Sequence, residues 1–372
     1  MKKYFPVELH CHTNHSDGSM SPGFLVESAK KRGYAAIAVT DHNTASAFES
    51  AAAAGEKYGV CVIKGIEWTT FFGHIVCLHD DANVADWREL NMDNIDAHAE
   101  KARGKNAVLT LAHPMRVGAP AANGCRMEFR IKRFDLFSAV EVWSQNDPPD
   151  SRANVLSEKM YDGILSGGFR LAAVYGFDWH SPGADLPYFI NTYIGAENLN
   201  AEDLKEGIRR GDTYIAMGLQ VELLADGEKL PFGAEIGEGE HTFELKISKG
   251  LCQGEVLPLE IVLKGTAIEC GEKAREAESE DGLKRAVVKC GEKMQRAESE
   301  DGLKRTVVEC GEKAREAESE DGGNSQVKSV RFGAEEKMRV QTRKGFLRFE
   351  VHGIADGKRL PLVFTSPVWV VY

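Results

Sequence analysis

The chain has 372 residues, of which 42% are apolar, 28% charged and 8% aromatic, and its formal net charge is −11. This composition excludes collagen-like, disordered and disulfide-scaffold classes, and the acidity argues against non-specific nucleic-acid binding, which needs a basic surface. No apolar run approaches the roughly 20 residues of a membrane helix, and the first residues show no signal-peptide pattern. We therefore expect a soluble, cytoplasmic protein that has no membrane partner.

Short β-branched runs alternate with helical patterns through the first 217 residues. The strand candidates are Val7–His12, Ala35–Asp41, Cys61–Trp68, His74–His79, Asn106–His113, Ala139–Ser144, Arg170–Trp179 and Asn191–Ile194. The helix candidates are Pro22–Arg32, Ala45–Tyr58, Asn91–Arg103, Arg152–Leu165 and Ala201–Arg210. Such alternation indicates an α/β fold with a mainly parallel sheet, and the number of repetitions suggests a barrel or distorted barrel.

The pattern changes after Gly218, where glycines become frequent and helix signals disappear. Apolar and polar residues alternate with period two in His241–Ser248, Leu259–Lys264, Gly345–His352 and Val368–Tyr372. This alternation predicts a small antiparallel β-sandwich in the second part of the chain.

Three near-identical units interrupt that second part. They are Glu269–Val288, Lys289–Val308 and the partial unit Glu309–Gly322. We interpret each unit as a charged hairpin. A helical form is the alternative, because Glu, Lys, Arg and Ala have good helix propensity, although the units lack an apolar stripe.

Histidines gather at the end of the first predicted strand. His10 and His12 are two residues apart, so strand alternation places both imidazoles on one face and Cys11 on the other. Asp17 follows in a turn that can bring its carboxylate back over the strand end. A metal ion would explain this convergence.

Similar side chains stand at the ends of the other predicted strands. They are His42, Glu67, His74, His113, Asp178 and His180. In an α/β barrel the carboxyl ends of the strands meet at one mouth, where binding sites are built. Closely packed imidazoles and carboxylates of this kind are best explained by divalent cations.

These segments resemble the motifs of the polymerase and histidinol phosphatase (PHP) family of metal-dependent hydrolases. The motifs are His10-x-His12, Ser16-Asp17-Gly18, Asp41-His42-Asn43, Gly65-x-Glu67, His113-Pro114 and Asp178-x-His180. The pair Gly73-His74 and the Val140–Trp143 segment resemble the carbaryl-hydrolase-like branch more closely. The resemblance implies a distorted (β/α)7 barrel over residues 1–217, followed by the β-sandwich over 218–372 with the repeats inserted at 269–322.

The resemblance also implies two to three divalent metal ions, with Zn, Mn or Fe as suitable elements for mixed His and carboxylate ligands. One ion would be held by His10, His12, Glu67 and Asp178, a second by Glu67, His74 and His113, and a third by Asp17, His42 and His180. His15 could assist Asp17, although a supporting or exposed position is favoured. His79, His98, His241 and His352 are expected to take no part. Asp41 is expected to cap or support, and Glu141 either supports a ligand or packs.

The function favoured by these motifs is hydrolysis of a small-molecule or nucleotide phosphate ester by a metal-bridged hydroxide, with Glu67 as the bridging carboxylate. Arg116, three residues after His113, is the candidate for holding a phosphate oxygen. The alternative is a carbamate, amide or aryl-ester hydrolase with the same metals. A non-catalytic binding module is the third hypothesis, and it is disfavoured because all nine ligand positions carry suitable residue types.

Overall fold

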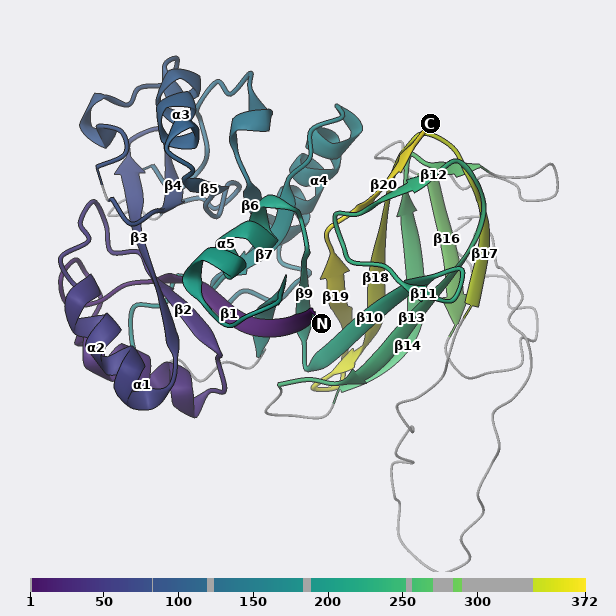
Figure 1. The fold of residues 1–372 in the computed structure, drawn as a ribbon, viewed down its shortest axis with the longest axis horizontal. Helices are drawn as coiled ribbons and strands as arrows, with labels where there is room; N and C mark the ends of the chain where they lie inside the picture. The colour runs from purple at the N-terminus through teal and green to yellow at the C-terminus, as the bar shows by residue number, and fades with distance from the viewer. Residues whose placement is uncertain are drawn as a thin grey trace, which may run out of the picture.

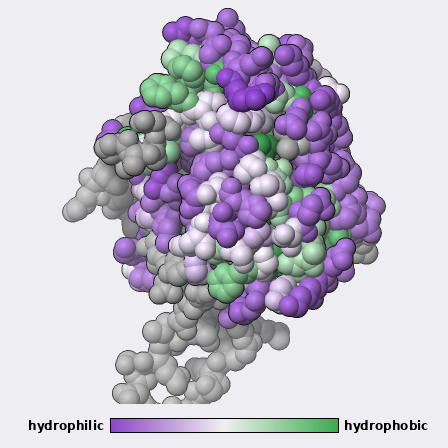
Figure 2. Space-filling view, turned by 90° about the vertical axis from the view of Figure 1, so that its left-hand side faces the viewer, coloured by the Kyte–Doolittle hydropathy of each residue, from purple (hydrophilic) through white to green (hydrophobic). Residues whose placement is uncertain are grey.

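The computed structural model describes residues 2–81, 83–118, 124–182, 189–251, 256–269, 284–289 and 337–372. An α/β part formed by the first half of the chain lies beside a part built from strands (Figure 1). Within the described residues, no helix has the length and apolar character needed to cross a membrane. The face shown in Figure 2 is mostly hydrophilic, with apolar residues only in small groups.

Each strand and helix predicted for the first half is present, with ends shifted by a few residues, and one further strand, Thr213–Met217, was not predicted. The strands are β1 (Lys3–Cys11), β2 (Ala36–Val39), β3 (Cys61–Thr70), β4 (Gly73–Leu78), β5 (Val108–Leu111), β6 (Ala139–Ser144), β7 (Ala172–Gly176), β8 (Ile190–Ala196) and β9 (Thr213–Met217). The helices are α1 (Pro22–Lys31), α2 (Phe48–Tyr58), α3 (Ile95–Gly104), α4 (Arg152–Ser166) and α5 (Ala201–Arg209). Ser21 caps α1 by accepting a hydrogen bond from the Phe24 amide, and Pro22 occupies the first turn, as this sequence pattern favours.

The sheet is only partly parallel. Strands β1, β2 and β3 are parallel, as are β5, β6 and β7, but β4 runs antiparallel to both β3 and β5. The reason is the connection between β3 and β4, where Phe71 and Phe72 alone join the two strands. Two residues can form a hairpin but cannot form the helical crossover that parallel strands require. The expectation of a mainly parallel sheet therefore fails at β4.

The segment after β7 returns to the end of β1. The Trp179 amide donates to the His10 carbonyl at 3.0 Å, and the His12 amide donates to the Trp179 carbonyl at 2.9 Å. These two bonds bring the residues that follow β7 beside those that end β1, and so place residues 10–12 next to residues 178–180.

The second half forms strands only, within the residues that the structure describes. They are β10 (Leu219–Ala225), β11 (Glu228–Lys229), β12 (Glu235–Gly237), β13 (Gly239–Lys249), β14 (Val256–Gly265), β15 (Ile268–Glu269), β16 (Lys284–Lys289), β17 (Lys337–Thr342), β18 (Gly345–Ala355), β19 (Lys358–Thr365) and β20 (Val368–Val371). One sheet has the order β11-β10-β13-β17-β15. It faces β18 through Phe243 and Phe349, whose ring centroids are 5.6 Å apart.

The larger sheet continues from the first half into the second. Strand β9 pairs with β8 on one side and with β19 on the other, both antiparallel. The chain then leaves this sheet at Gly218, whose φ of +68° lies in the left-handed region, and enters the smaller sheet with β10. The position at which the sequence pattern changes is thus a change of sheet, although hydrogen bonding across β9 and β19 is continuous.

The predicted repeats lie largely outside the described residues. Within the first unit, Lys284–Lys289 forms β16, which pairs antiparallel with β14, and Glu269 ends β15. The predicted Val-Val strand of that unit is therefore present. The hairpin interpretation of residues 270–283 and 290–322 stays a prediction.

A buried ionic cluster joins the two halves. Arg348 of β18 is fully buried, and its guanidinium donates to both carboxylate oxygens of Asp162 on α4, at 2.8 and 2.9 Å. It also donates to Glu350 at 2.5 Å. Lys264 of β14 binds the same Asp162 carboxylate at 2.6 Å. Helix α4 is thereby fixed to β14 and β18 by charged hydrogen bonds that are shielded from water.

Candidate metal centre

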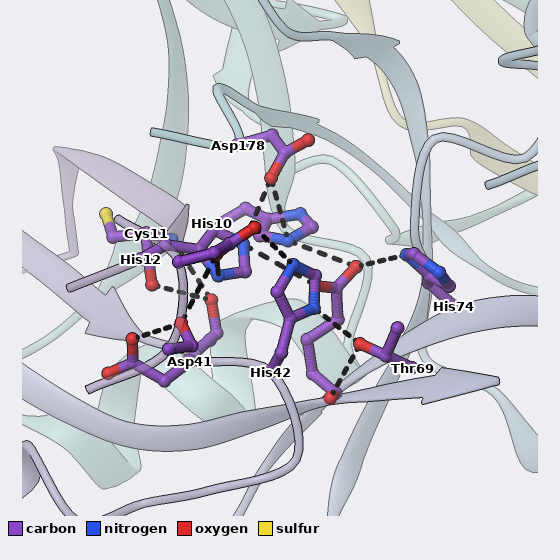
Figure 3. A network of polar contacts seen from close by, with 12 residues as sticks. His10, Cys11, His12, Asp41, His42, Thr69, His74 and Asp178 are labelled. Atoms are coloured by element: carbon purple, nitrogen blue, oxygen red, sulfur yellow. Dashed lines mark hydrogen bonds and ion pairs between the residues drawn. The ribbon is translucent and has the colours of Figure 1, made fainter. Parts of the chain in front are cut away.

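The end of β1 presents two imidazoles to one side. His10 and His12 are both fully buried, with ring centroids 5.0 Å apart. Cys11 lies between them and is also buried, but its sulfur points away from the imidazoles (Figure 3). The predicted alternation along this strand is therefore confirmed.

Glu67 of β3 lies at the middle of the cluster and is fully buried. Nitrogen atoms of five imidazoles surround its carboxylate at 2.7 to 3.5 Å, those of His10, His12, His42, His74 and His113. Burial alone would raise the pKa of Glu67, but the imidazoles of His10, His113 and His42 hold it well below its usual value. Glu67 is therefore an anion placed to contact more than one cation.

Asp178 lies above the imidazoles of His10 and His12 in the view of Figure 3. Its Oδ1 is 3.0 Å from His12 Nε2 and 3.5 Å from His10 Nε2, and its Oδ2 accepts a hydrogen bond from Gln145 at 2.5 Å. Burial would raise the pKa of Asp178, but His10 and His12 hold it well below its usual value. The residue has a φ of +55°, a conformation that is uncommon outside glycine and is found at functional sites.

Asp17, His42 and His180 form the open side of the cluster. Their side chains are 57%, 24% and 33% exposed. Asp17 Oδ2 lies 3.4 Å from His42 Nε2, and Asp17 Oδ1 lies 3.2 Å from His180 Nε2. A ligand arriving from solvent would meet these three side chains first.

All nine sequence-predicted ligand candidates are thus in one place. Three groups of side chains have donor atoms within 4.8 Å of one another: His10, His12 and Glu67; Glu67, His74 and His113; and His12, Asp17, His42 and His180. Asp178 adjoins the first group, because its Oδ1 lies 3.0 Å from His12 Nε2 and 3.5 Å from His10 Nε2. These groups follow the predicted division into three sites, with His12 also close to the third.

The hydrogen bonding of the imidazoles fits metal ligation. The Nδ1 atoms of three rings face oxygen acceptors: Glu141 Oε1 for His10 at 2.8 Å, the Cys125 carbonyl for His113 at 3.1 Å and the Asp178 carbonyl for His180 at 2.7 Å. A proton on Nδ1 leaves the Nε2 lone pair directed to the centre, which is the usual arrangement of metal-bound histidine.

The hydrogen bonding of the buried atoms at the centre also fits metal binding. Among the described residues, six buried atoms of the cluster make no hydrogen bond of suitable geometry, although several lie within ion-pair distance of one another: His10 Nε2, both ring nitrogens of His12, Glu67 Oε2, His74 Nε2 and Asp178 Oδ1. Buried polar atoms without partners are costly, so a bound cation accounts for them. The residues present therefore fit a group of divalent metal ions.

The carboxylates also raise the affinity of the imidazoles for positive charge. Burial would lower the pKa of His10, but Glu141, Glu67 and Asp178 hold it well above its usual value, and the pKa of His113 is raised by Glu67 and Asp178 against the effect of burial. His12 differs, because burial lowers its pKa. Protons and metal ions would compete for the raised imidazoles, so metal affinity should fall as the pH falls.

Supporting carboxylates hold the ligand candidates in position. Glu141 of β6 accepts from His10 Nδ1 and, through Oε2, from the His113 amide at 2.7 Å. Gly176 leaves room for it, since a Cβ there would lie 2.1 Å from Glu141 Oε1. Asp41 accepts from the Thr13 amide, the Thr13 hydroxyl and the Ser16 hydroxyl, and so fixes the loop that carries Asp17. The supporting interpretation of Asp41 and Glu141 agrees with these contacts.

Glu8 is a site residue that the sequence analysis missed. It is fully buried, and its Oε1 accepts from the His10 and Phe177 amides at 2.9 and 2.8 Å. Burial raises its pKa to about 8. The signal that could have found it is strand alternation, because Glu8 precedes His10 by two residues and shares its face.

The hydrogen bonds of the remaining histidines are with residues other than the nine ligand candidates. His15 is exposed and contacts the Ser46 hydroxyl, and His79 contacts the backbone of Asp81. His98 contacts the carbonyl of Asn94 just before α3, His241 contacts Asp226 in the turn after β10, and His352 contacts Glu350 on its own strand β18.

Arg116 lies at the rim rather than among the ligand candidates. Its guanidinium donates to Asp147 at 3.2 Å, and its side chain is 30% exposed. Among the described residues, no hydrogen bond or ion pair joins it to the nine ligand candidates. Its predicted contact with a substrate oxygen therefore requires the guanidinium to leave or share Asp147.

Replacing Glu141 by Gln should weaken metal binding about 10- to 100-fold, the usual effect of removing a partner that orients a ligand. His10 Nδ1 and the His113 amide both donate to this side chain, and an amide group offers only one acceptor. Metal titration of the variant would measure the effect, with Glu100→Gln as the control, because the Glu100 side chain on α3 is 69% exposed. Unchanged affinity would show that Glu141 only packs.

Comparisons with known proteins give one family match and several short stretches of sequence similarity. Residues 8–115 match the PHP domain family, a range that holds seven of the nine ligand candidates. A PolC-type DNA polymerase III of Oceanobacillus iheyensis is 51% identical over 63 residues, which are 16% of this chain and 4% of that protein. A 5'-3' exoribonuclease of Haemophilus influenzae is 38% identical over 84 residues, 22% of this chain and 30% of that protein.

The chain therefore spans less than a third of either curated relative. Among solved structures, a two-domain protein of Bacteroides vulgatus, described as containing a predicted PHP-like metal-dependent phosphoesterase, is similar over 98% of this chain and 95% of that one. Its sequence identity is 15% and its TM-score 0.48.

Proposed function

We propose that this chain is a metal-dependent hydrolase of the PHP type, whose substrate is a small-molecule or nucleotide phosphate ester. The observation that carries the proposal is Glu67, one buried carboxylate surrounded by five imidazoles, with unsatisfied nitrogen and oxygen atoms directed to the same point. The match of residues 8–115 to the PHP domain supports it.

The proposal includes the finer features that the motif resemblance implies. These are a distorted (β/α)7 barrel over residues 1–217, a β-sandwich over 218–372, and two to three ions chosen among Zn, Mn and Fe. The ligand sets proposed are His10, His12, Glu67 and Asp178 for one ion, Glu67, His74 and His113 for a second, and Asp17, His42 and His180 for a third. The carbaryl-hydrolase-like branch and the cytoplasmic location stay predictions.

Divalent ions at such a site lower the pKa of water toward about 7 and stabilise negative charge on the group that is attacked. Other residues of the chain orient the ligand candidates. Glu141 holds the proton of His10 on Nδ1, and the Cys125 carbonyl does the same for His113, so both rings keep Nε2 free. Gln145 fixes the Asp178 carboxylate, and Asp41 fixes the loop of Asp17.

Substrate entry is proposed on the side of Asp17, His42 and His180, because their side chains are the exposed members of the cluster. Arg116 is the cation at the rim that could turn from Asp147 to an anionic substrate oxygen. Its planar fork suits a phosphate group, and this favours a phosphate ester over the alternative carbamate, amide or aryl ester.

Metal analysis of protein purified without chelator, followed by a substrate panel, tests the proposal. We expect two to three equivalents of transition metal, and hydrolysis of at least one phosphomonoester, phosphodiester or nucleotide when Mn, Zn or Fe is supplied. Less than one equivalent would contradict the metal centre. Turnover of aryl carbamates alone would keep the metal centre and replace the phosphate ester by the alternative substrate.

A further inference from the structure

Strand β7 stands at one end of the larger sheet. Among the described strands it forms a ladder with β6, and its other edge faces away from that partner. The amides on this second edge belong to alternate residues, Ala173, Tyr175 and Phe177, all of which are buried. Buried amides need acceptors, so this edge has to be closed by groups other than a neighbouring strand.

Side-chain oxygens close the edge. Three acceptors serve the three amides in order: Ser366 Oγ at 2.8 Å, Thr192 Oγ1 at 2.7 Å and Glu8 Oε1 at 2.8 Å. They come from the residue after β19, from β8 and from β1. The edge of β7 is thus held against the rest of the sheet by a row of three side chains.

Glu8 is the member of this row that lies next to the metal centre. Its side chain is fully buried, and the Oε1 atom that accepts from the Phe177 amide also accepts from the His10 amide at 2.9 Å. Phe177 directly precedes Asp178, and His10 is a ligand candidate itself. One oxygen atom therefore joins the backbone of two segments that carry proposed ligands.

The backbone of Asp178 needs such support. Its φ of +55° is unfavourable for a residue with a Cβ, and conformations of this kind persist only where the surroundings fix them. The residue before it is bonded to Glu8, and the amide of the residue after it, Trp179, donates to the His10 carbonyl at 3.0 Å. Held on both sides, the Asp178 carboxylate points to the imidazoles (Figure 3), with Oδ1 3.5 Å from His10 Nε2.

From these contacts we propose that Glu8 is a positioning residue of the metal centre. By accepting from the Phe177 amide it fixes the backbone from which Asp178 meets a metal ion. Glu8 acts through two amides and is not itself a ligand, and because Oε1 accepts both bonds, the oxygen atom rather than the charge is what the site requires. The inference rests on the proposed function, to which the ligand set of His10, His12, Glu67 and Asp178 belongs.

Titration of the metal-free full chain with Mn²⁺ tests the proposal in two variants of Glu8. Glu8→Gln keeps a side-chain oxygen in the same place, so it should bind Mn²⁺ like the unchanged chain. Glu8→Met has a similar length but no oxygen. It should bind one equivalent about 10- to 100-fold more weakly, the usual effect of losing a residue that orients a ligand. Glu8→Ala is the second variant without an oxygen, for use if Glu8→Met does not fold.

Thr192→Val is the matched control. Thr192 is also buried, and its hydroxyl accepts from the Tyr175 amide and donates to the Tyr175 carbonyl at 3.0 Å. Its loss opens the same edge of β7 two residues further from the metal centre. We expect the free energy of unfolding, measured in urea, to fall in both Thr192→Val and Glu8→Met, and the affinity for Mn²⁺ to fall in Glu8→Met alone.

Several results would overturn the positioning role. They are an unchanged Mn²⁺ affinity in Glu8→Met, an equal loss of affinity in Thr192→Val, and weaker binding in Glu8→Gln, which would assign the effect to the charge. Failure of both oxygen-free variants to fold would show that Glu8 serves the fold as a whole, and would equally overturn a role specific to the metal centre.

The unchanged chain separates this inference from the proposed function. If it binds no Mn²⁺, Zn²⁺ or Fe²⁺, the proposed function fails and the inference fails with it. If it binds metal and Glu8→Met binds with the same affinity, the inference alone fails.

Discussion

Changing Glu67 to Gln should reduce turnover by about three orders of magnitude or more and lower the metal content of the purified protein. The carboxylate contacts five imidazoles and is shared by two of the three proposed ligand sets. An amide of the same volume keeps the packing but removes the negative charge that balances the cations. Charge stabilisation at such centres is worth several kcal/mol, which corresponds to a loss of this size in rate.

Turnover of the best panel substrate and elemental analysis of the same preparation would measure both effects. Glu56→Gln is the matched control, because Glu56 is exposed on α2 and lies outside the cluster. Activity and metal content equal to the unchanged protein would contradict the central role of Glu67. A loss of turnover with full metal content would restrict that role to the reaction itself.

The largest effect on stability is expected for Arg348→Ala. This guanidinium is fully buried and makes three charged hydrogen bonds, two to Asp162 and one to Glu350. Removing one partner of a buried ionic cluster leaves the others unpaired, which costs about 3–5 kcal/mol. The free energy of unfolding, measured in urea, should fall by that amount.

Arg339→Ala provides the comparison for Arg348→Ala. Arg339 is 71% exposed and lies 3.7 Å from Glu240, and surface pairs of this kind contribute about 0–1 kcal/mol. If the free energy of unfolding fell equally in the two variants, the buried cluster would contribute no more stability than an exposed ion pair. A smaller loss for Arg348→Met than for Arg348→Ala would show that part of the effect is packing.

Local sequence patterns predicted much of the fold and identified the residues that the structure places together in the site. The sequence patterns identified the α-helices of the first half and all of its strands except β9, and the cap formed by Ser21 with Pro22 placed a helix start correctly. Histidines at i and i+2 in β1 were predicted to share a face, and they do. These features depend on neighbours in sequence, which is why sequence alone reveals them.

Features that depend on distant residues were missed. Strand β4 is antiparallel because a two-residue connection excludes a crossover. The residues of β4 themselves do not indicate the direction of the strand. Arg116 was placed by its distance from His113 along the chain, but Asp147 determines where its guanidinium lies. Glu8 looked like an ordinary strand residue, because its burial depends on amides from residues 10 and 177.

The pairing of β9 with β19 has a consequence for dissecting the molecule. A fragment that stops at residue 217 would keep all nine ligand candidates but lose the neighbour of β9, since Thr365, Phe364 and Val363 of β19 are its partners. The freed edge would present unpaired amides and carbonyls, which are templates for aggregation. The fragment would also lack Ser366, whose hydroxyl accepts a hydrogen bond from the Ala173 amide of β7. The metal centre is therefore best studied in the complete chain, because the second half completes the sheet on which that centre is built.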